Sequence, residues 1–587
     1  MAAPGGPPIY AEIGRLGASI PLAPFRARAG GEAGLRKILN ALTVTERPHP
    51  GRPRGMSGAS RHAYFIDRGA PGGPALIIPR IKAEILVRAR GAGAALLDGV
   101  LEAPARTGAG APHPNAPLPA PRRIAAERLR EEEPLYEYQE AAVRYLCEST
   151  RGSNYLQMDT GLGKSRVGCA YAARRGEPTL VVVPTEAIAH QWIDEFAELY
   201  PDMRTALFRN PAKGSKRAPP GPETHDAVLI IVNTFREKEA SFLEGYGLVI
   251  LDEAHEYHSV HNGRALWLSQ TRAVLGLSAT PDERPDGLDR YVHLHLGAPI
   301  MPATIPGFDA RAVNFRGAAR VVEYSGHPAH SETVSTPAGT MSAILTINGV
   351  LKDPARMDLV AAETERLYML HERGTPEELA AAGLGPRPAS AATAAHPAGE
   401  IRRHGVFVFA ETRDYLPALR EALQRRMGGA EIVAPELEPT RVSILRGGVA
   451  KTAVGDARRA RAHIVLTTYG FSRRGISLPD MTAIVEATPR RNGMRQILGR
   501  ILRRGSDESI VRQVVDIVDC RTGLKGQAAD RRKIYREKGY PISKVAVSWD
   551  SGAAPAAEAA AQDEDSAFAD WTSEELLAAA MGDGEDD

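Results

Sequence analysis

Cysteine is nearly absent from this chain of 587 residues, which holds only three, at Cys147, Cys169 and Cys520. Cysteines so few and so far apart exclude a disulfide framework and form no paired C-x-x-C metal site, which favours a reducing compartment. Long apolar runs are missing too, because none approaches the roughly 20 residues that a membrane span needs. The N-terminus, MAAPGGPPIYAEIGRLG, lacks the continuous apolar core of a signal peptide. We therefore expect a soluble intracellular protein of the nucleus or cytoplasm, with no membrane partner.

Basic residues are absent from the end of the chain. Residues 551–587 contain 11 acidic residues and no Lys or Arg, so a net charge of +2 for the whole chain leaves +13 on residues 1–550. A basic body with an acidic tail is typical of a protein that binds a polyanion. The alternative is that the arginine simply follows an Ala-, Gly-, Pro- and Arg-rich composition. Within the tail, DWTSEELLAAAM predicts either a short helix that binds a protein partner or a solvating segment.

Two α/β domains in tandem are predicted from the alternation of apolar strands with helical patterns. Residues 134–300 contain the strands TLVVVP, AVLIIV, YGLVILDE and AVLGLSAT, and residues 401–525 contain GVFVFA, AHIVLTT, TAIVEAT and VVDIVD. Continuous apolar strands are typical of parallel sheets that are covered on both faces. The sequence therefore predicts an α/β protein with two parallel sheets.

Composition sets the other predicted boundaries. We expect an N-terminal accessory domain over 1–101, with strands in ALIIPRI and AEILVRA, and an extended Pro/Ala-rich linker over 102–133. Residues 301–400 are predicted to connect the two α/β domains, with one helix after KDP and a second low-complexity linker. Residues 526–587 are predicted to be a basic and then acidic tail, disordered for lack of apolar residues.

The stretch MDTGLGKS, Met158 to Ser165, ends like a phosphate-binding loop. It has methionine where the strict pattern G-x-x-x-x-G-K-[ST] has its first glycine. Phosphate binding needs backbone N–H groups at a helix N-terminus, glycines that let the phosphates approach, and a lysine. The residues that supply these here are Thr160, Gly161, Gly163, Lys164 and Ser165. SNYLQM before the loop predicts a strand and RVGCAYAARR after it a helix, which is the context that the pattern requires.

Two carboxylates close the predicted strand GLVILDE. Asp252 is placed to hold Mg²⁺ through water together with the Ser165 hydroxyl, and Glu253 to take a proton from the water that attacks the γ-phosphate. The alternative, a pair that only caps a helix, leaves both Lys164 upstream and the strand-ending SAT downstream unexplained.

Arginines follow in the second α/β domain, where GMRQILGRILRRG carries Gln496, Arg500 and Arg503. Residues three apart share one face of a helix. Arg500 and Arg503 are therefore predicted to reach the γ-phosphate as arginine fingers. The alternative is a solvated basic run, which is our interpretation of Arg474 and Arg504.

Taken in order, these motifs resemble those of superfamily 2 helicases and translocases. YEYQ with Gln139 resembles the adenine-reading glutamine. MDTGLGKS, DEAH and SAT resemble motifs I, II and III, and VFVFAET, TTYGFSRRGISLPD and QILGRILR resemble motifs IV, V and VI. The resemblance covers about residues 134–520 and implies two RecA-like domains with ATP and Mg²⁺ in the cleft between them. It also places His255 and Gln496 in the nucleotide site.

Within the superfamily, LGLSATPDERPDGLDRYVHLHLGAPI and RQILGRILRRG look most like the XPB-like and type III restriction-motor branch. Helicases of large nucleocytoplasmic DNA viruses are similar, and there too an IPR-like strand precedes the motor, as Ile78-Pro79-Arg80 does here. A viral origin would place the protein in the host cell or the virion. Motif V has Ser477 where many relatives have aspartate, which favours DNA. Gly499 in motif VI sets the chain apart from chromatin-remodeller motors.

The same resemblance implies nucleic-acid contacts across the top of both domains. The residues are Pro184, Thr185, Asn233, Thr234, Thr467 and Thr468. Hydroxyl, amide and main-chain donors to phosphate carry no base identity. We therefore expect sequence-tolerant, salt-sensitive binding. For each threonine, an ordinary cap at a strand end is the alternative.

These features predict an ATP-dependent DNA helicase or translocase that moves on or unwinds single-stranded or duplex DNA in transcription, repair or replication. An RNA helicase is one alternative, because the motor motifs do not read the sugar. A restriction motor subunit is another, disfavoured because residues 1–130 and 526–587 show no nuclease-like cluster. The third is an ATP-gated transcription or repair factor that binds DNA and a protein partner without unwinding.

Overall fold

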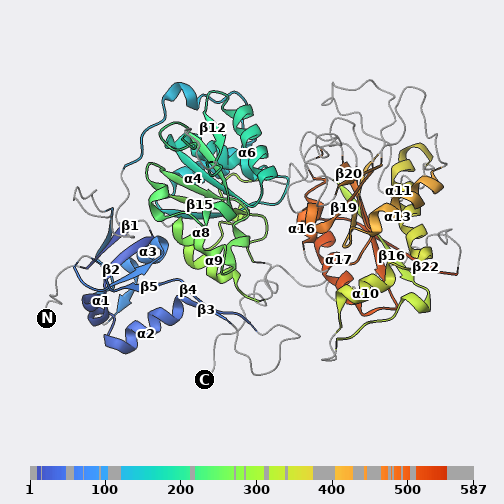
Figure 1. The fold of residues 1–587 in the computed structure, drawn as a ribbon, viewed down its shortest axis with the longest axis horizontal. Helices are drawn as coiled ribbons and strands as arrows, with labels where there is room; N and C mark the ends of the chain where they lie inside the picture. Colours follow the sequence, from blue (N-terminus) through green and yellow to red (C-terminus); the bar gives the residue numbers. More distant parts are fainter. Residues whose placement is uncertain are drawn as a thin grey trace.

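A computed structural model of the chain describes most of its residues. The ranges are 9–14, 16–47, 59–70, 72–91, 94–102, 120–211, 218–269, 273–282, 286–309, 316–336, 341–373, 404–427, 442–445, 464–472, 478, 481–490, 493–502 and 511–550. No helix in these ranges is long and apolar enough to cross a membrane. Three units follow one another along the chain, coloured from blue to red in Figure 1.

The N-terminal unit is built on a mixed five-stranded sheet in the order β5-β6-β2-β1-β9. The strands are β1 (Tyr10–Gly14), β2 (Gly17–Pro21), β5 (Phe65–Asp67), β6 (Ala75–Ile78) and β9 (Gly99–Glu102). Two small hairpins pair β3 (Thr43–Thr45) with β4 (Ser60–His62) and β7 (Arg90–Gly91) with β8 (Ala94–Ala95). The helices are α1 (Leu22–Arg28), α2 (Gly31–Ala41) and α3 (Arg80–Arg88).

The predicted strand in AEILVRA is wrong, because these residues lie in α3. A short apolar run does not by itself distinguish a strand from a helix. Here Pro79 precedes the first turn, and Arg80 and Glu84, one turn apart, form an ion pair with 3.0 Å between Nε and Oε1. Helix α3 packs on the first α/β unit, since the backbone N–H of Gly152, just before β10 of that unit, donates to the Glu84 carboxylate.

Six parallel strands form the sheet of the first α/β unit, in the order β10-β15-β14-β11-β13-β12. Their bounds are β10 (Ser153–Gln157), β11 (Thr179–Val183), β12 (Thr205–Leu207), β13 (Ala227–Ile231), β14 (Leu248–Leu251) and β15 (Val274–Ser278). The helical elements are α4 (Glu137–Glu148), α5 (Lys164–Arg175), α6 (Glu186–Leu199), α7 (Val232–Phe235), η2 (Ala240–Leu243), η3 (Ala254–His258), α8 (Gly263–Leu268) and α9 (Asp289–Leu296).

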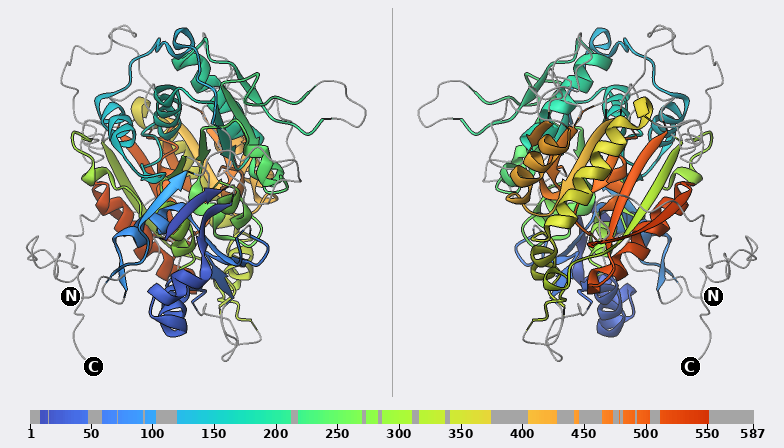
Figure 2. Two further views of the ribbon diagram at one scale, coloured as in Figure 1. Left: turned by 90° about the vertical axis from the view of Figure 1, so that its left-hand side faces the viewer. Right: turned by 90° about the vertical axis from the view of Figure 1, so that its right-hand side faces the viewer.

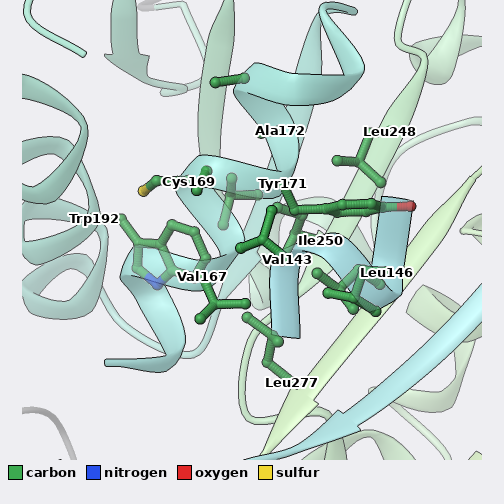
Figure 3. Close-up of a cluster of buried hydrophobic side chains, with 14 of the residues drawn as sticks. Val143, Leu146, Val167, Cys169, Tyr171, Ala172, Trp192, Leu248, Ile250 and Leu277 are labelled. Carbon is green, nitrogen blue, oxygen red and sulfur yellow. The ribbon is translucent and has the colours of Figure 1, made fainter. Parts of the chain in front are cut away.

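Both faces of this sheet are covered. On one face α4, α5 and α6 bring Val143, Tyr171 and Trp192 against Ile250 and its neighbours (Figure 3). On the other, α8 and α9 form a second apolar cluster with the same strands. All five residues of β11 are buried. This arrangement explains why the strands are continuous apolar runs and confirms the predicted parallel sheet.

The second α/β unit has seven parallel strands in the order β18-β19-β17-β20-β21-β16-β22. Their bounds are β16 (Gly317–Ser325), β17 (Gly405–Ala410), β18 (Val442–Leu445), β19 (Ile464–Thr468), β20 (Met481–Glu486), β21 (Arg512–Asp519) and β22 (Ile542–Ser548). The helical elements are η6 (Pro328–His330), α10 (Ala343–Val350), α11 (Pro354–Arg373), α13 (Tyr415–Arg426), α15 (Tyr469–Ser472), α16 (Met494–Leu498), η7 (Gly523–Gly526) and α17 (Gln527–Glu537). The short η4 (Pro302–Thr304) lies between Ile300 and Ile305, which both pack in the core of the first α/β unit. The right-hand view of Figure 2 shows α11, in yellow, lying across this sheet.

Two strands of the second sheet come from outside the predicted 401–525. β16 belongs to residues 301–400, predicted as a connection, and α17 and β22 belong to residues 526–587, predicted as a disordered tail. Both predictions are wrong for these segments. β22 buries only Val545 and Val547, so its sequence carries little apolar signal. Its hydrogen bonds come from β16, a strand distant in sequence, which local patterns do not reveal.

The predicted linker over 102–133 also differs from the structure, which places residues 120–133 on the first α/β unit. Ile124 joins the apolar core, and η1 (Ala126–Leu129) follows it. Arg122 and Arg128 donate to the buried carboxylate of Asp226 at 2.7 and 3.0 Å. Burial is offset by these hydrogen bonds, which hold the pKa of Asp226 to about 2. Ion pairs with Asp226 hold the segment in place, and the composition of residues 102–133 does not reveal this distant carboxylate.

Candidate nucleotide site and nucleic-acid interface

The loop between β10 and α5 has the shape of a phosphate-binding loop. Gly161 and Gly163 have φ of +95° and +78°, a region that glycine adopts without strain. Gly163 caps α5, so the first N–H groups of that helix face the loop. The Lys164 ammonium donates to the carbonyl of Met158 at 3.3 Å, across the loop. Met158, which replaces the first glycine, is fully buried in the core.

Gln139, on α4, lies directly against this loop. It is 1% exposed, and its Nε2 donates to the carbonyl of Leu162 at 3.0 Å. Its Oε1 accepts from the N–H of Tyr136 at 3.2 Å, which fixes the amide. A Cβ on Gly163 would lie 2.4 Å from Gln139 Nε2. The predicted adenine-reading residue and the predicted phosphate loop are therefore in contact.

The two carboxylates stand at the end of β14, beside the loop. The Asp252 side chain accepts from the indole N–H of Trp192 at 2.9 Å. Burial, and then the adjacent Glu253 carboxylate, raise the pKa of Asp252 to about 6, against the lowering effect of Trp192 and Lys164. Glu253 has φ +47° and ψ +48°, and it is the one non-glycine residue with positive φ among those described. Such backbone strain often accompanies a functional position.

These oxygens fit Mg²⁺. Asp252 is a buried carboxylate, and Oε2 of Glu253 is buried without a hydrogen-bond partner among the described residues. Hard oxygen ligands of this kind suit Mg²⁺, which keeps several waters and takes others from phosphates. Ser165 follows Lys164 in the first turn of α5, at the same loop. Within the described part of the chain, no group of three or more His, Cys, Asp or Glu is arranged to hold a metal by itself.

His255 links the two α/β units. Its Nδ1 is 3.0 Å from the Ser278 hydroxyl at the end of β15 and 3.4 Å from the Glu253 carboxylate. Its Nε2 is 3.5 Å from Nε2 of Gln496, on α16 of the second unit. The motifs DEAH, SAT and QILGR, predicted from separate stretches, thus meet at one place.

The residues after α16 approach the phosphate loop closely. A Cβ on Gly499 would lie 2.2 Å from Thr160 Cβ, and one on Gly161 would lie 2.4 Å from the carbonyl of Leu502. Burial lowers the pKa of Arg500, while the charge of Glu253 acts in the opposite direction. Arg500 therefore lies within the electrostatic reach of Glu253, and its role as an arginine finger remains a prediction. Arg503, predicted as a second finger, lies outside the described residues, as do Ser477 and Arg474.

Two residues at this site were not predicted. Trp192 orients Asp252 from α6, and Lys538 forms an ion pair with Asp159 of the phosphate loop, 2.5 Å between Nζ and Oδ2. Trp192 is one apolar residue among many on its helix, so its sequence context carried no signal. Lys538 follows α17, a segment that was predicted to be disordered.

The predicted nucleic-acid contacts have different surroundings. Pro184 and Thr185 follow β11, and Thr185 caps α6 by accepting from the N–H of Ile188. Asn233 and Thr234 lie in α7, directly after β13, and Asn233 is exposed.

In the second unit, Thr467 is fully buried, and its hydroxyl donates to the carbonyl of Leu445 at 2.7 Å. That hydroxyl is thus used within the sheet and does not face a ligand. Thr468, next to it, is 6% exposed at the end of β19. Residues 570–581, predicted as either a partner-binding helix or a solvating segment, lie outside the described part of the chain.

Comparison with known proteins identifies the family. The family model described as "Type III restriction enzyme, res subunit" matches residues 132–283. The "Putative ATP-dependent RNA helicase QP509L" of an African swine fever virus isolate from a Namibian warthog is 38% identical over 519 residues, 87% of this chain and 88% of that protein. The "DNA 3'-5' helicase XPB" of Mycobacterium tuberculosis is 26% identical over 402 residues, 66% of this chain and 62% of that one.

Among solved structures, yeast Dbp5 bound to RNA and ADP–BeF3 aligns with 70% of this chain and 90% of its own, at 14% identity and a TM-score of 0.45. The family rests on the viral relative, which is similar over nearly the whole length of both proteins. The chain belongs to the superfamily 2 helicases, with the helicases of large DNA viruses, and is a nucleic-acid-dependent ATP hydrolase.

Proposed function

We propose that this protein is a DNA-directed motor, which binds ATP between its two α/β units and uses hydrolysis to move on or unwind DNA. The observation that carries the proposal is the meeting of the phosphate loop with α16. Gly499 touches Thr160, and Gln496 reaches His255. A ligand held by both units draws them together, and its hydrolysis releases them.

In this proposal each residue at the boundary has a role. Lys164 and the N-terminus of α5 hold the phosphates, and Gln139 reads the adenine edge beside the loop. Glu253 orients and deprotonates the attacking water, and Arg500 stabilises the charge that develops. His255 passes the state of the site to the second unit through Gln496.

Asp252 and Ser165 would hold Mg²⁺, which when bound neutralises charge on the phosphates. The role of Trp192 is to keep the Asp252 carboxylate in one orientation. Arg503 acts as a second finger in this proposal, on the strength of its spacing from Arg500 in the sequence.

The nucleic acid would lie across the strand ends that carry Pro184, Thr185, Asn233, Thr234 and Thr468. Contacts through hydroxyl and amide groups to phosphate are independent of base identity. Opening and closing of the two units would move these groups relative to each other. If the two units bind the strand tightly in turn, each cycle of hydrolysis moves the protein one step along it. A net charge of +13 on residues 1–550 supports salt-sensitive binding of a polyanion.

DNA is favoured by similarity to the XPB protein, named as a DNA helicase, and by Ser477 in motif V. RNA is a second candidate, because the African swine fever virus relative is named as an RNA helicase. The residues of the site act on ATP in either case, so the choice depends on how the strand's sugar is recognised.

The test is ATP hydrolysis by the purified chain, without nucleic acid and then with single-stranded DNA, duplex DNA, a forked duplex or single-stranded RNA. We expect DNA to stimulate hydrolysis most and Lys164→Ala to abolish it, because the lysine meets the phosphate charge. Strand displacement on the forked duplex separates unwinding from movement alone. If RNA stimulates hydrolysis more strongly than DNA, the protein acts on RNA instead. If neither nucleic acid stimulates hydrolysis, the proposal that the protein is a motor is refuted.

A further inference from the structure

Lys538 lies where the second α/β unit reaches the phosphate loop of the first. Its ammonium is 2.5 Å from the Asp159 carboxylate, and the two side chains are 20% and 38% exposed. Asp159 immediately precedes Thr160 and Gly161, the residues that Gly499 and Leu502 approach. The contact is therefore part of the same boundary as the motif VI contacts.

Helix α17, which Lys538 directly follows, is fixed to its sheet. Arg531, 1% exposed on α17, donates to both oxygens of Asp516 on β21 at 2.9 and 2.6 Å. Tyr535 donates to Glu486 on β20 at 3.2 Å. A buried, doubly hydrogen-bonded pair of this kind holds its helix in one place. Lys538 therefore moves with the second sheet as one body.

α17 is also tied to α16. The Arg495 guanidinium pairs with the carboxylate of Glu537, the residue before Lys538. Since Arg495 lies on α16 and Arg500 lies just beyond the end of that helix, the cation at Lys538 and the proposed arginine finger approach the phosphate loop together. The geometry couples one to the other without a further contact.

Asp159 places a negative charge in a loop that is proposed to hold phosphates. A bare carboxylate there repels the ligand, and the repulsion is strong where solvent is partly excluded. We infer that Lys538 is a positioning residue that neutralises Asp159 when the two units close, and so makes phosphate binding conditional on closure. The inference rests on the proposed role of residues 158–165 as the phosphate-binding loop.

This arrangement makes Asp159 an electrostatic gate. When the units part, Asp159 loses its partner and disfavours the phosphates, which helps to release the nucleotide. When they close, Lys538 removes the repulsion at the moment that Arg500 reaches Glu253. The pair therefore links nucleotide affinity to closure, beyond what the loop and the arginine finger supply.

The experiment compares Lys538→Met, Asp159→Asn and the double variant in nucleic-acid-stimulated ATP hydrolysis, with kcat and KM for ATP separated. Lys538→Met leaves Asp159 bare, so we expect KM to rise and kcat/KM to fall about 3- to 10-fold. Adding Asp159→Asn removes the repulsion and should restore kcat/KM to within about 2-fold of Asp159→Asn alone. Lys533→Met, at an exposed position on α17, the helix before Lys538, is the matched control, and its kcat and KM should equal those of the wild type.

A double variant no better than Lys538→Met would overturn the inference, as would Lys538→Met behaving like Lys533→Met. Lys538→Gln is a second variant that keeps the side-chain length, and it should show the same suppression by Asp159→Asn. Loss of all activity in Lys164→Ala, with none of these effects, would leave the proposed function standing and refute only the role of Lys538. A wild-type chain without ATP hydrolysis would refute the proposed function itself.

Discussion

Replacing Gly499 with alanine tests the approach of the second unit to the phosphate loop. Gly499 ends α16 with φ −58° and ψ −15°, a conformation that alanine adopts readily. The variant therefore introduces no backbone strain and adds only a methyl group. That methyl carbon would lie 2.2 Å from Cβ and 2.4 Å from Cγ2 of Thr160.

The expected magnitude follows from this geometry. Carbon atoms in contact prefer about 3.5–4.0 Å, so the two units must part by roughly 1.5 Å at this point. Overpacking of this kind costs about 1–3 kcal/mol, which corresponds to about 5- to 150-fold in an equilibrium. Because the methyl acts only when the units meet, the cost opposes closure. We expect kcat/KM for ATP to fall by that factor.

The assay is steady-state ATP hydrolysis with saturating nucleic acid, beside a thermal unfolding curve. The matched control is Gly526→Ala, since Gly526 has φ −59° and open space where its Cβ would be. We expect Gly526→Ala to hydrolyse ATP like the wild type, and both variants to unfold at the wild-type temperature. Hydrolysis by Gly499→Ala within twofold of the wild type would refute the reasoning that this contact closes during catalysis.

Two further predictions concern stability and charge. The pKa of Asp226 in the folded chain, about 2, lies below the value of about 3.9 for an unfolded chain, so its contribution to stability is complete above about pH 4 and is lost as the pH falls toward 2. Asp226→Asn should therefore lower the free energy of unfolding at pH 7 by at most about 2 kcal/mol, allowing for solvent screening at its partly exposed arginine partners, and equal cost at pH 7 and pH 2 in denaturant titrations would contradict this. Deleting residues 551–587 removes 11 acidic residues and should raise DNA affinity at low salt, with the gain fading as salt is added; an affinity that is unchanged across the salt series rules out the effect.

Much of the nucleotide site was predictable because its chemistry is local. A phosphate loop needs consecutive residues, so GLGKS reveals itself even though Met158 replaces the first glycine. Asp252 and Glu253 are recognisable because they close an apolar strand. In the structure, Gln139 contacts the loop that carries Lys164, and Asp252 lies within the electrostatic reach of Lys164.

Pairing between distant segments was not predictable from the patterns. β16 and β22 join the second sheet through strands far away in sequence, and Arg122 and Arg128 find Asp226 across about 100 residues. Local composition suggested a linker and a tail in these places. Local composition indicates which segments favour an ordered structure, but it does not indicate which distant strand or side chain they will contact.

The sequence alone indicated the superfamily 2 helicase family and the α/β fold, because its apolar strands and its phosphate and carboxylate motifs each occupy a few consecutive residues. Tertiary structure decided the rest of the site: that Trp192 holds Asp252, that Gly499 must lack a side chain beside Thr160, and that Lys538 pairs with Asp159. The physical reason is the same for all three. Each depends on the packing of elements that are distant in the sequence, and packing is set by shape and charge summed over the whole fold.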